Sequence, residues 1–398
     1  MSELRINNIT DRAGSSGPII AGVSTVASTS HMVMPSGPTE MRGGRGRGVF
    51  AGSYTPSSPN NSSTMNLIEI ATTGNATDFG DTAAAGSHGS TSNSTRGVFN
   101  YGDVPNSIVT MNFTVISSQG GVADFGDLSF VTRDGPFGAG DNTRGILGGS
   151  AGGPSNMGGS PGKGVNFIDF ITFATTGDSN EFGNLTVARR GVGACSSPTR
   201  TVWGGGYIKP QNHTKTIDFV TTQTKGDATK FGELTVSRGQ MGAVSSPTRG
   251  VWFGGGAASP LNKVNTIDYV QIMTKGNAVD FGDTTVAASR GLGSGSNAVR
   301  GVLHLGYTPT VLNTVDFITI ATLGNAQDFG DLTEARFQAG GAASTTRLVV
   351  MGGSSPSLVD TMDYAQIMTT GNFVSFGELV GSDRAQTGGC SNGHGGLG

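Results

Sequence analysis

Seven Phe-Gly pairs recur at similar spacing along this chain of 398 residues and divide most of it into units of similar length. Successive pairs are 46 to 57 residues apart. A repeat at a fixed period of roughly 20–50 residues indicates a small structural unit that stacks against copies of itself. The phenylalanines of the seven pairs are Phe79, Phe125, Phe182, Phe231, Phe281, Phe329 and Phe376.

Other residues keep a fixed distance from these pairs. A glycine lies five residues before each Phe, and an Asp or Asn lies 13 residues before it. An arginine followed by a short apolar run also occurs once in each unit. The seven arginines are Arg47, Arg96, Arg144, Arg200, Arg249, Arg300 and Arg347.

Each unit reads as a set of short β-strands. Thr216–Thr222 (TIDFVTT) alternates in the manner of a half-buried strand, and Thr248–Gly256 (TRGVWFGGG) is a second strand that ends in glycines. Gly239–Ser246 (GQMGAVSS) is a third, made of small residues that suit a crowded interior. No segment shows a sustained helical period. Units of about 50 residues with three or four strands are typical of propeller blades, so we expect an all-β, seven-bladed β-propeller over residues 45–398.

Two units contain, in order, a double glycine, an acidic-aromatic pair and an arginine. These residues are Gly204-Gly205, Asp218-Phe219 and Arg238, and Gly254-Gly255, Asp268-Tyr269 and Arg290. This order resembles the kelch repeat. The usual kelch Trp is replaced by a block of the Asp-Phe-Gly-Asp type. The resemblance implies a kelch-like propeller.

The two ends of the repeat region complement each other. The last unit stops before an arginine-led apolar strand, and such a strand lies at the other end, in residues 47–52 (RGVFAG). We therefore expect residues 47–52 to complete the last blade, so that an N-terminal strand closes the ring. Closure removes the unpaired sheet edges that an open array would expose.

Residues 1–44 do not fit the repeat and are interpreted as an extended attachment arm, with contacts expected from Leu4, Ile6, Ile9, Ile19 and Ile20. The string LRINNITDRAGSSGP resembles the N-terminal pieces of tail-associated structural proteins of marine tailed phages. The repeat strings NTIDYV and SPTRGV are similar to repeats in predicted structural proteins of such phages. The resemblance implies a phage virion structural protein in a tail fibre, tail tip or capsid surface. Its partners would be other virion proteins, and it would form an oligomer through assembly on the extracellular particle.

Two kinds of connection alternate along the chain, and they should lie on opposite faces. The turns before the repeated arginines keep their length, whereas the stretches after the glycine runs vary. Variable loops on a rigid scaffold commonly carry recognition, so a host glycan or a virion partner should bind there. The expected contact residues are Tyr54, Tyr101, Tyr207 and Tyr307, although these tyrosines would also suit simple loop caps.

The sequence shows little that favours catalysis. Five histidines have no metal-ligand spacing, and the blocks of the Asp-Phe-Gly-Asp type suit turns better than a calcium loop. Cys195 and Cys390 fall in blades three and seven, which are too far apart for a disulfide. Each repeated arginine should pair with an acidic residue of its own or a neighbouring blade, and not form a ligand-binding ring. We expect a non-enzymatic protein with no catalytic residues, metal or cofactor.

Charge and hydropathy exclude further classes. The net charge is −3, without the excess of basic residues that a nucleic-acid-binding face needs. No apolar run approaches the roughly 20 residues that span a bilayer, so membrane insertion is not expected. Two alternatives to a virion protein stay open, namely a cellular kelch-type interaction scaffold or adhesin, and a glycan-cleaving enzyme. The enzyme would need two carboxylates about 5–9.5 Å apart, for which Asp103, Asp134 and Asp141 are the candidates.

Overall fold

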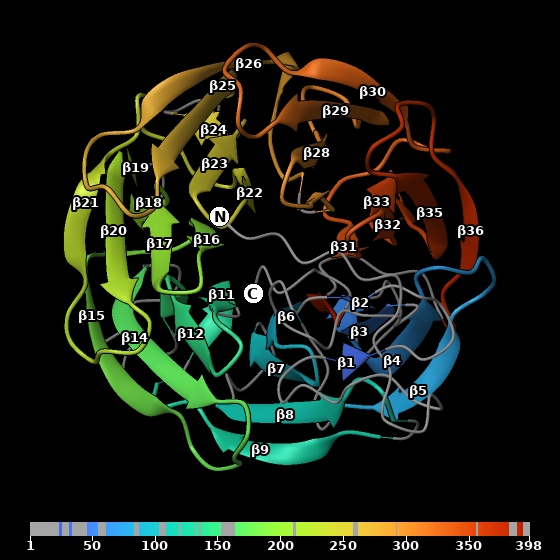
Figure 1. Ribbon diagram of the computed structural model, residues 1–398, viewed down its shortest axis with the longest axis horizontal. Helices are drawn as coiled ribbons and strands as arrows, with labels where there is room; N and C mark the ends of the chain where they lie inside the picture. The colour runs from blue at the N-terminus through green and yellow to red at the C-terminus, as the bar shows by residue number, and fades with distance from the viewer. Residues whose placement is uncertain are drawn as a thin grey trace, which may run out of the picture.

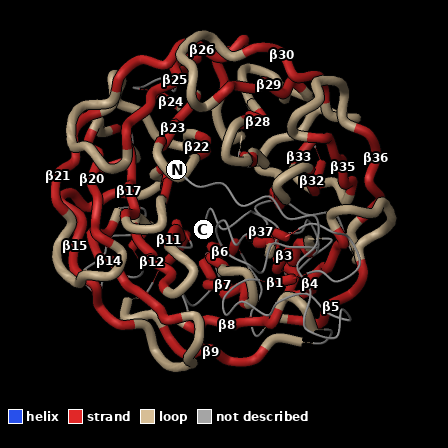
Figure 2. Tube along the Cα trace, in the orientation of Figure 1, coloured by secondary structure: helices blue, strands red, loops and turns tan. Residues whose placement is uncertain are grey.

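The computed structural model is a closed ring of seven antiparallel blades with four main strands each, and the described residues contain no helix (Figures 1 and 2). The expected seven-bladed β-propeller is confirmed. The structure describes residues 24–25, 32–33, 46–54, 61–82, 87–102, 109–118, 121–130, 132–134, 137–152, 164–209, 212–257, 262–291, 293–355, 357–381 and 388–392.

Within each blade the strands run from the central axis outward in a fixed order. Blade 1 contains β37 (Gly388–Ser391), β3 (Arg47–Tyr54), β4 (Asn61–Glu69) and β5 (Thr77–Asp81). Blade 2 contains β6 (Ser87–Ser92), β7 (Arg96–Gly102), β8 (Thr110–Val115) and β9 (Ala123–Asp127). Blade 3 contains β11 (Phe137–Gly140), β12 (Arg144–Gly148), β14 (Val165–Thr172) and β15 (Asn180–Arg189). Blade 4 contains β16 (Gly193–Ser196), β17 (Arg200–Gly204), β20 (Thr216–Thr221) and β21 (Thr229–Glu233).

The remaining three blades repeat this order. Blade 5 contains β22 (Gly242–Ser245), β23 (Arg249–Phe253), β25 (Asn262–Gln271) and β26 (Val279–Ala288). Blade 6 contains β27 (Gly295–Ser296), β28 (Arg300–His304), β29 (Thr314–Thr319) and β30 (Gln327–Asp331). Blade 7 contains β31 (Gly340–Ala343), β32 (Arg347–Met351), β35 (Thr361–Gln366) and β36 (Val374–Glu378).

Several short strands lie outside the four main strands of the blades. Most of them lie in the connections between the second and third strands of the blades, where the variable loops were expected. They are β1 (Ser24–Thr25) with β2 (Met32–Val33), β10 (Thr132–Asp134) with β13 (Ala151–Gly152), β18 (Tyr207–Lys209) with β19 (Asn212–His213), β24 (Gly256–Ala257) with β25, and β33 (Ser354–Ser355) with β34 (Ser357–Leu358).

The ring is closed by an N-terminal strand, as expected, because β3 pairs with the C-terminal strand β37, but the blade that contains this pairing is not the expected one. Residues 47–52 lie in blade 1 with β4 and β5, and do not enter the last blade. The strand that crosses the seam is β37, which pairs with β3 from Gly48↔Ser391 to Ala51↔Gly388. The reason is that β37 (GGCS) has the small-residue composition of an innermost strand, like β16 (GACS), whereas blade 7 already has four strands of its own.

The two cysteines also lie in other blades than expected. Cys195 lies on β16 in blade 4 and Cys390 on β37 in blade 1, and not in blades 3 and 7. Both thiols are free and buried, and burial raises the pKa of each to about 12. They therefore behave as small apolar side chains of the inner strands.

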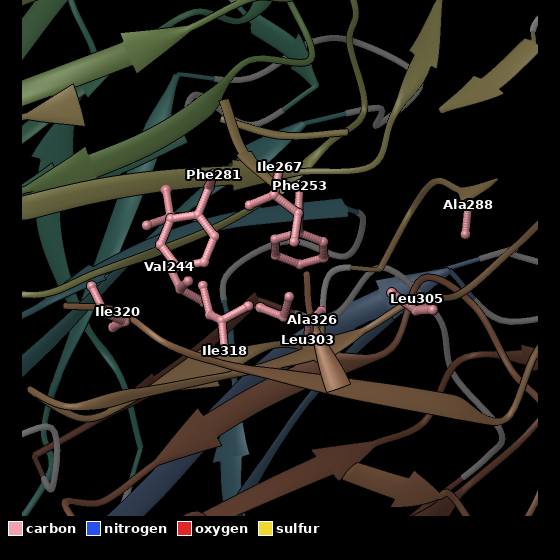
Figure 3. Packing of buried hydrophobic residues seen from close by; sticks show 11 residues of the cluster. Val244, Phe253, Ile267, Phe281, Ala288, Leu303, Leu305, Ile318, Ile320 and Ala326 are labelled. Carbon is pink, nitrogen blue, oxygen red and sulfur yellow. The ribbon is translucent and has the colours of Figure 1, made fainter. Parts of the chain in front are cut away.

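The hydrophobic core consists of seven clusters, one between each pair of adjacent blades. In the cluster between blades 5 and 6, Phe253 and Phe281 of blade 5 face Leu303 and Ile318 of blade 6 (Figure 3). Because every blade buries one face against each neighbour, no blade has a complete core alone. Burial between repeats therefore holds the ring together.

The Phe-Gly pair recurs because it joins neighbouring blades at the rim. In six of the seven seams the N–H of a turn glycine donates to the carbonyl of the Phe in the preceding blade, as in Gly324 to Phe281 at 2.8 Å. The Gly of the pair then lies against that turn, and a side chain at Gly282, where φ is +141°, would overlap the backbone of Gly324. The last of these bonds, from Gly74 to Phe376 at 2.8 Å, joins blade 1 to blade 7, where the ring closes.

Candidate functional site

The seven repeated arginines hold adjacent blades together. Six guanidinium groups lie over an aromatic ring of the third strand in their own blade, 4.3 to 4.7 Å from its centroid. Every Nη1 also donates to a backbone carbonyl of the next blade. The acceptors, in the order of the arginines from Arg47 to Arg347, are Ser117, Phe173, Thr222, Ile272, Ile320, Ile367 and Ile70.

The expected acidic partners are absent for six of these arginines within the described part of the chain. Only Arg47 has one, Glu69 at 2.7 Å. Blade 1 carries Leu67 where the others have an aromatic ring, so a carboxylate takes the place of the missing cation–π contact. All seven arginines join blades, as predicted, but the predicted acidic partner is found for Arg47 alone among the described residues, because ring faces and carbonyls satisfy the other six.

A buried aspartate on the third strand ties five blades to the preceding one. Each carboxylate accepts from both the backbone N–H and the hydroxyl of a Ser or Thr, at 2.5 to 3.2 Å. Three carboxylates also pair with a fully buried arginine at 2.9 to 3.0 Å. The pairs with Ser or Thr are Asp169–Ser129, Asp218–Thr186, Asp268–Thr235, Asp316–Thr285 and Asp363–Thr333. The ion pairs are Asp218–Arg189, Asp268–Arg238 and Asp363–Arg336.

A different set of residues gathers where the innermost strands begin, on the face of the variable loops. Nine residues after the Phe of four successive Phe-Gly pairs, the chain adopts a left-handed conformation. One of these residues is Gly191, but the others are Gln240, Arg290 and Gln338, with φ of 53° to 62°. A non-glycine residue in this region costs about 1 kcal/mol, and such outliers cluster at functional sites.

Backbone hydrogen bonds connect these four positions from blade to blade around the axis. The N–H of Gln240 donates to Gly191, at 3.0 Å, and that of Arg290 donates to Gln240 at 3.1 Å. The N–H of Gln338 donates to Arg290 at 3.2 Å. The three long polar side chains are therefore presented in sequence along one arc at the mouth of the ring.

Aromatic rings and cations surround this arc. Tyr207 packs on His213 with centroids 4.4 Å apart, and Tyr307 packs on Phe337 at 5.4 Å. Three cations lie over these rings, at 5.2 to 5.9 Å from the centroids. We call the set the axial-mouth cluster; it comprises Arg190, Tyr207, His213, Gln240, Lys263, Arg290, Tyr307, Phe337 and Gln338.

The axial-mouth cluster contains three cations, Arg190, Lys263 and Arg290. Arg290 donates from Nε to the Gln240 side chain at 3.3 Å and has no carboxylate within ion-pair distance among the described residues. Burial, together with the nearby Arg290 guanidinium, lowers the pKa of Lys263. Burial raises the pKa of the Tyr207 phenol, although Arg290 and Arg190 act in the opposite direction. An anion placed here would relieve the repulsion between like charges.

Two of the four tyrosines predicted as contact residues belong to this cluster. Tyr207 and Tyr307 are half-buried, and each pairs through its backbone with the loop that precedes an innermost strand. Tyr54 is the last residue of β3 and Tyr101 is the last but one of β7, and their side chains lie outside the described part of the structure. The arm residues Leu4, Ile6, Ile9, Ile19 and Ile20 also lie outside it.

Sequence reasoning missed the charged members of the cluster. The signal was present, because Gln240, Arg290 and Gln338 align with Gly191 at a fixed distance after Phe-Gly. A glycine in one copy of a repeat indicates a left-handed position in the others. The kelch resemblance had instead equated Arg238 with Arg290, and the structure separates them: Arg238 is buried in an ion pair, whereas Arg290 lies at the mouth.

Of the three carboxylates considered for catalysis, the structure describes only that of Asp141, and it does not lie at this face. Asp141 is buried at the turn before Arg144, where it accepts from the N–H groups of Thr143 and Arg144. The side chains of Asp103 and Asp134 lie outside the described residues. No group of three or more metal-ligating side chains occurs in the described part of the chain, and no helix within it could cross a membrane.

His304 is a buried polar residue that is not a member of the axial-mouth cluster. Its Nε2 lies 2.8 Å from the carbonyl of Arg336 and donates to it, whereas Nδ1 has no partner among the described groups. Burial, followed by the Arg336 guanidinium, lowers the pKa of His304 to about 4. The imidazole is therefore neutral in the folded protein at pH 7.

This histidine should make stability depend on pH. An unfolded histidine has a pKa of about 6.5, so the unfolded state binds more protons as the pH falls from 6.5 to 4. We expect a loss of about 3 kcal/mol over that window, measured by urea unfolding. His304→Phe should reduce the slope, since Phe253 fills the equivalent position in blade 5. Equal slopes for both proteins would show that His304 does not titrate in this way.

Comparisons with known proteins add the fold alone. No known family and no curated protein sequence matches this chain. The solved structure of YjhT superposes with a TM-score of 0.58, covering 73% of this chain and 96% of YjhT, at 9% sequence identity. At that identity the likeness supports the propeller architecture and carries no argument about activity.

Proposed function

We propose that this chain is a non-enzymatic structural protein of a phage virion, a kelch-like propeller that binds a host glycan or a virion partner. The resemblance of its N-terminal and repeat strings to proteins of marine tailed phages supports the placement in a tail fibre, tail tip or capsid surface. The arm of residues 1–44 would hold it to other virion proteins. The propeller would then act as a binding module.

The axial-mouth cluster is the observation that supports binding. It lies on the face of the variable loops and combines aromatic rings with cations, a composition suited to recognition. Gln240, Arg290 and Gln338 keep strained backbone where Gly191 shows that glycine fits. Strain of this kind is retained where a side chain is needed.

Particles purified from the source culture provide the test. We expect mass spectrometry to find this chain at a fixed ratio to the capsid protein, and particles carrying Tyr207→Ala to adsorb to host cells at least tenfold less. Truncating a central aromatic contact commonly has an effect of this size. Lys275→Gln, an exposed substitution at a turn between the third and fourth strands, is the control. Absence of the chain from intact particles would contradict the virion assignment, and unchanged adsorption would contradict the binding face.

A further inference from the structure

The axial-mouth cluster also indicates what kind of ligand it would take. This step rests on the proposed function, because it assumes that the variable-loop face binds a glycan. We propose that the cluster binds an acidic oligosaccharide, whose carboxylate or sulfate pairs with Arg290 and Lys263 and whose successive sugar rings pack against Tyr207 and Tyr307.

Arg290 is suited to hold an oxyanion. Its backbone is fixed by hydrogen bonds to both neighbouring blades, since its N–H donates to Gln240 and its carbonyl accepts from Gln338. Nε is engaged by Gln240 and the guanidinium lies 5.8 Å from the Phe337 ring centroid, which orients the group. A planar guanidinium held in this way can donate two parallel hydrogen bonds to a carboxylate or sulfate.

Lys263 provides the second positive charge. It lies opposite Gly256 in the pairing of β24 with β25, and its Nζ is 5.2 Å from the Tyr307 ring centroid. The proximity of Arg290 acts to lower the pKa of Lys263, so the two cations are within electrostatic reach. A shared anion would stabilise both charged forms.

The aromatic residues favour a sugar over a simple ion. Tyr207 packs over Gly191 and Gly239, where an added side chain would meet its ring. Tyr307 lies two blade steps along the same arc and packs on Phe337. Half-buried tyrosines offer an apolar face together with a hydroxyl, which matches the mixed surface of a sugar ring. Gln240 and Gln338 add amide groups that can bond sugar hydroxyls.

Binding of oligogalacturonate and of its fully methyl-esterified form tests this proposal by calorimetry. The two probes share one backbone and differ in charge. We expect the acidic form to bind at least tenfold more tightly, with an affinity that falls as salt rises. Arg290→Gln should weaken acidic binding by roughly ten- to hundredfold, the effect of losing a charged hydrogen bond. Dextran sulfate should behave as the acidic form does, and neutral dextran as the ester does.

The variants are matched to the chain itself. Gln occupies the Arg290 position in the two neighbouring blades, so Arg290→Gln should leave the melting temperature unchanged. Lys275→Gln removes one positive charge at an exposed turn and should leave binding intact. Equal binding of acid and ester, or tighter binding of polyglutamate, would overturn the acidic-sugar assignment. If Tyr207→Ala then still reduced adsorption, the proposed function would stand without the acidic-sugar assignment.

Discussion

Deleting residues 388–398 is expected to open the ring and lower the free energy of unfolding by about 5 kcal/mol. The deletion removes β37, which forms four residue pairs with β3 and contributes the buried Cys390 to the core between blades 1 and 2. About four backbone hydrogen bonds, at about 1 kcal/mol each, account for most of the loss. The exposed edge of β3 would also favour association between molecules.

Thermal unfolding followed by circular dichroism measures this effect. A loss of about 5 kcal/mol corresponds to a decrease of roughly 5–10 °C in melting temperature for a domain of this size. Deleting only residues 393–398 keeps β37 and is the control. If the two truncated proteins melted at the same temperature, β37 would not be the strand that closes the ring.

The sequence predicted the propeller well because its repeated residues make repeated contacts. Phe-Gly joins blades at the rim, and the arginine spans each seam. A further regularity was visible in the repeats: the third-strand residue is Asp wherever Ser or Thr lies four residues after the Phe of the preceding unit. The two Asn positions, Asn66 and Asn112, follow Val380 and Ala83 instead. Carboxylate and hydroxyl are therefore retained or lost together.

Two features could not be predicted in the same way. A closed ring of repeats has no natural starting point, so the repeat spacing did not show which blade would share the two ends of the chain. The axial-mouth cluster combines residues far apart in the sequence, such as Gln240 and Arg290, through hydrogen bonds across blades. Its members also differ from one unit to the next, because a binding surface does not need the same residue in every blade.

The second large effect is expected for Arg238→Met, which should cost about 3–5 kcal/mol. Arg238 and Asp268 are fully buried and lie 3.0 Å apart, and Nη1 of the arginine also donates to the carbonyl of Thr266 at 2.6 Å. Removing the guanidinium leaves the carboxylate in the core with only the Thr235 donors. An unpaired buried charge is the reason for the large penalty.

One seam of the ring naturally lacks this arginine. At the next seam Ala288 occupies the position of Arg238, and there burial raises the pKa of Asp316. Asp268 in Arg238→Met should likewise acquire a raised pKa. Since the folded state would then hold this proton more tightly than the unfolded state, the contribution of Asp268 to stability should be greatest below pH 4 and be lost as the pH rises through the raised value.

Urea unfolding of Arg238→Met and of the double variant Arg238→Met/Asp268→Asn separates charge from packing. The double variant should regain much of the lost stability and should lack the pH dependence of the single variant. An amide carries no charge, and Asn already occupies this position in blades 1 and 2. If the double variant were as unstable as the single one, the cost would come from the lost packing of the arginine side chain. The buried ion pairs would then serve mainly to fill the seams between blades.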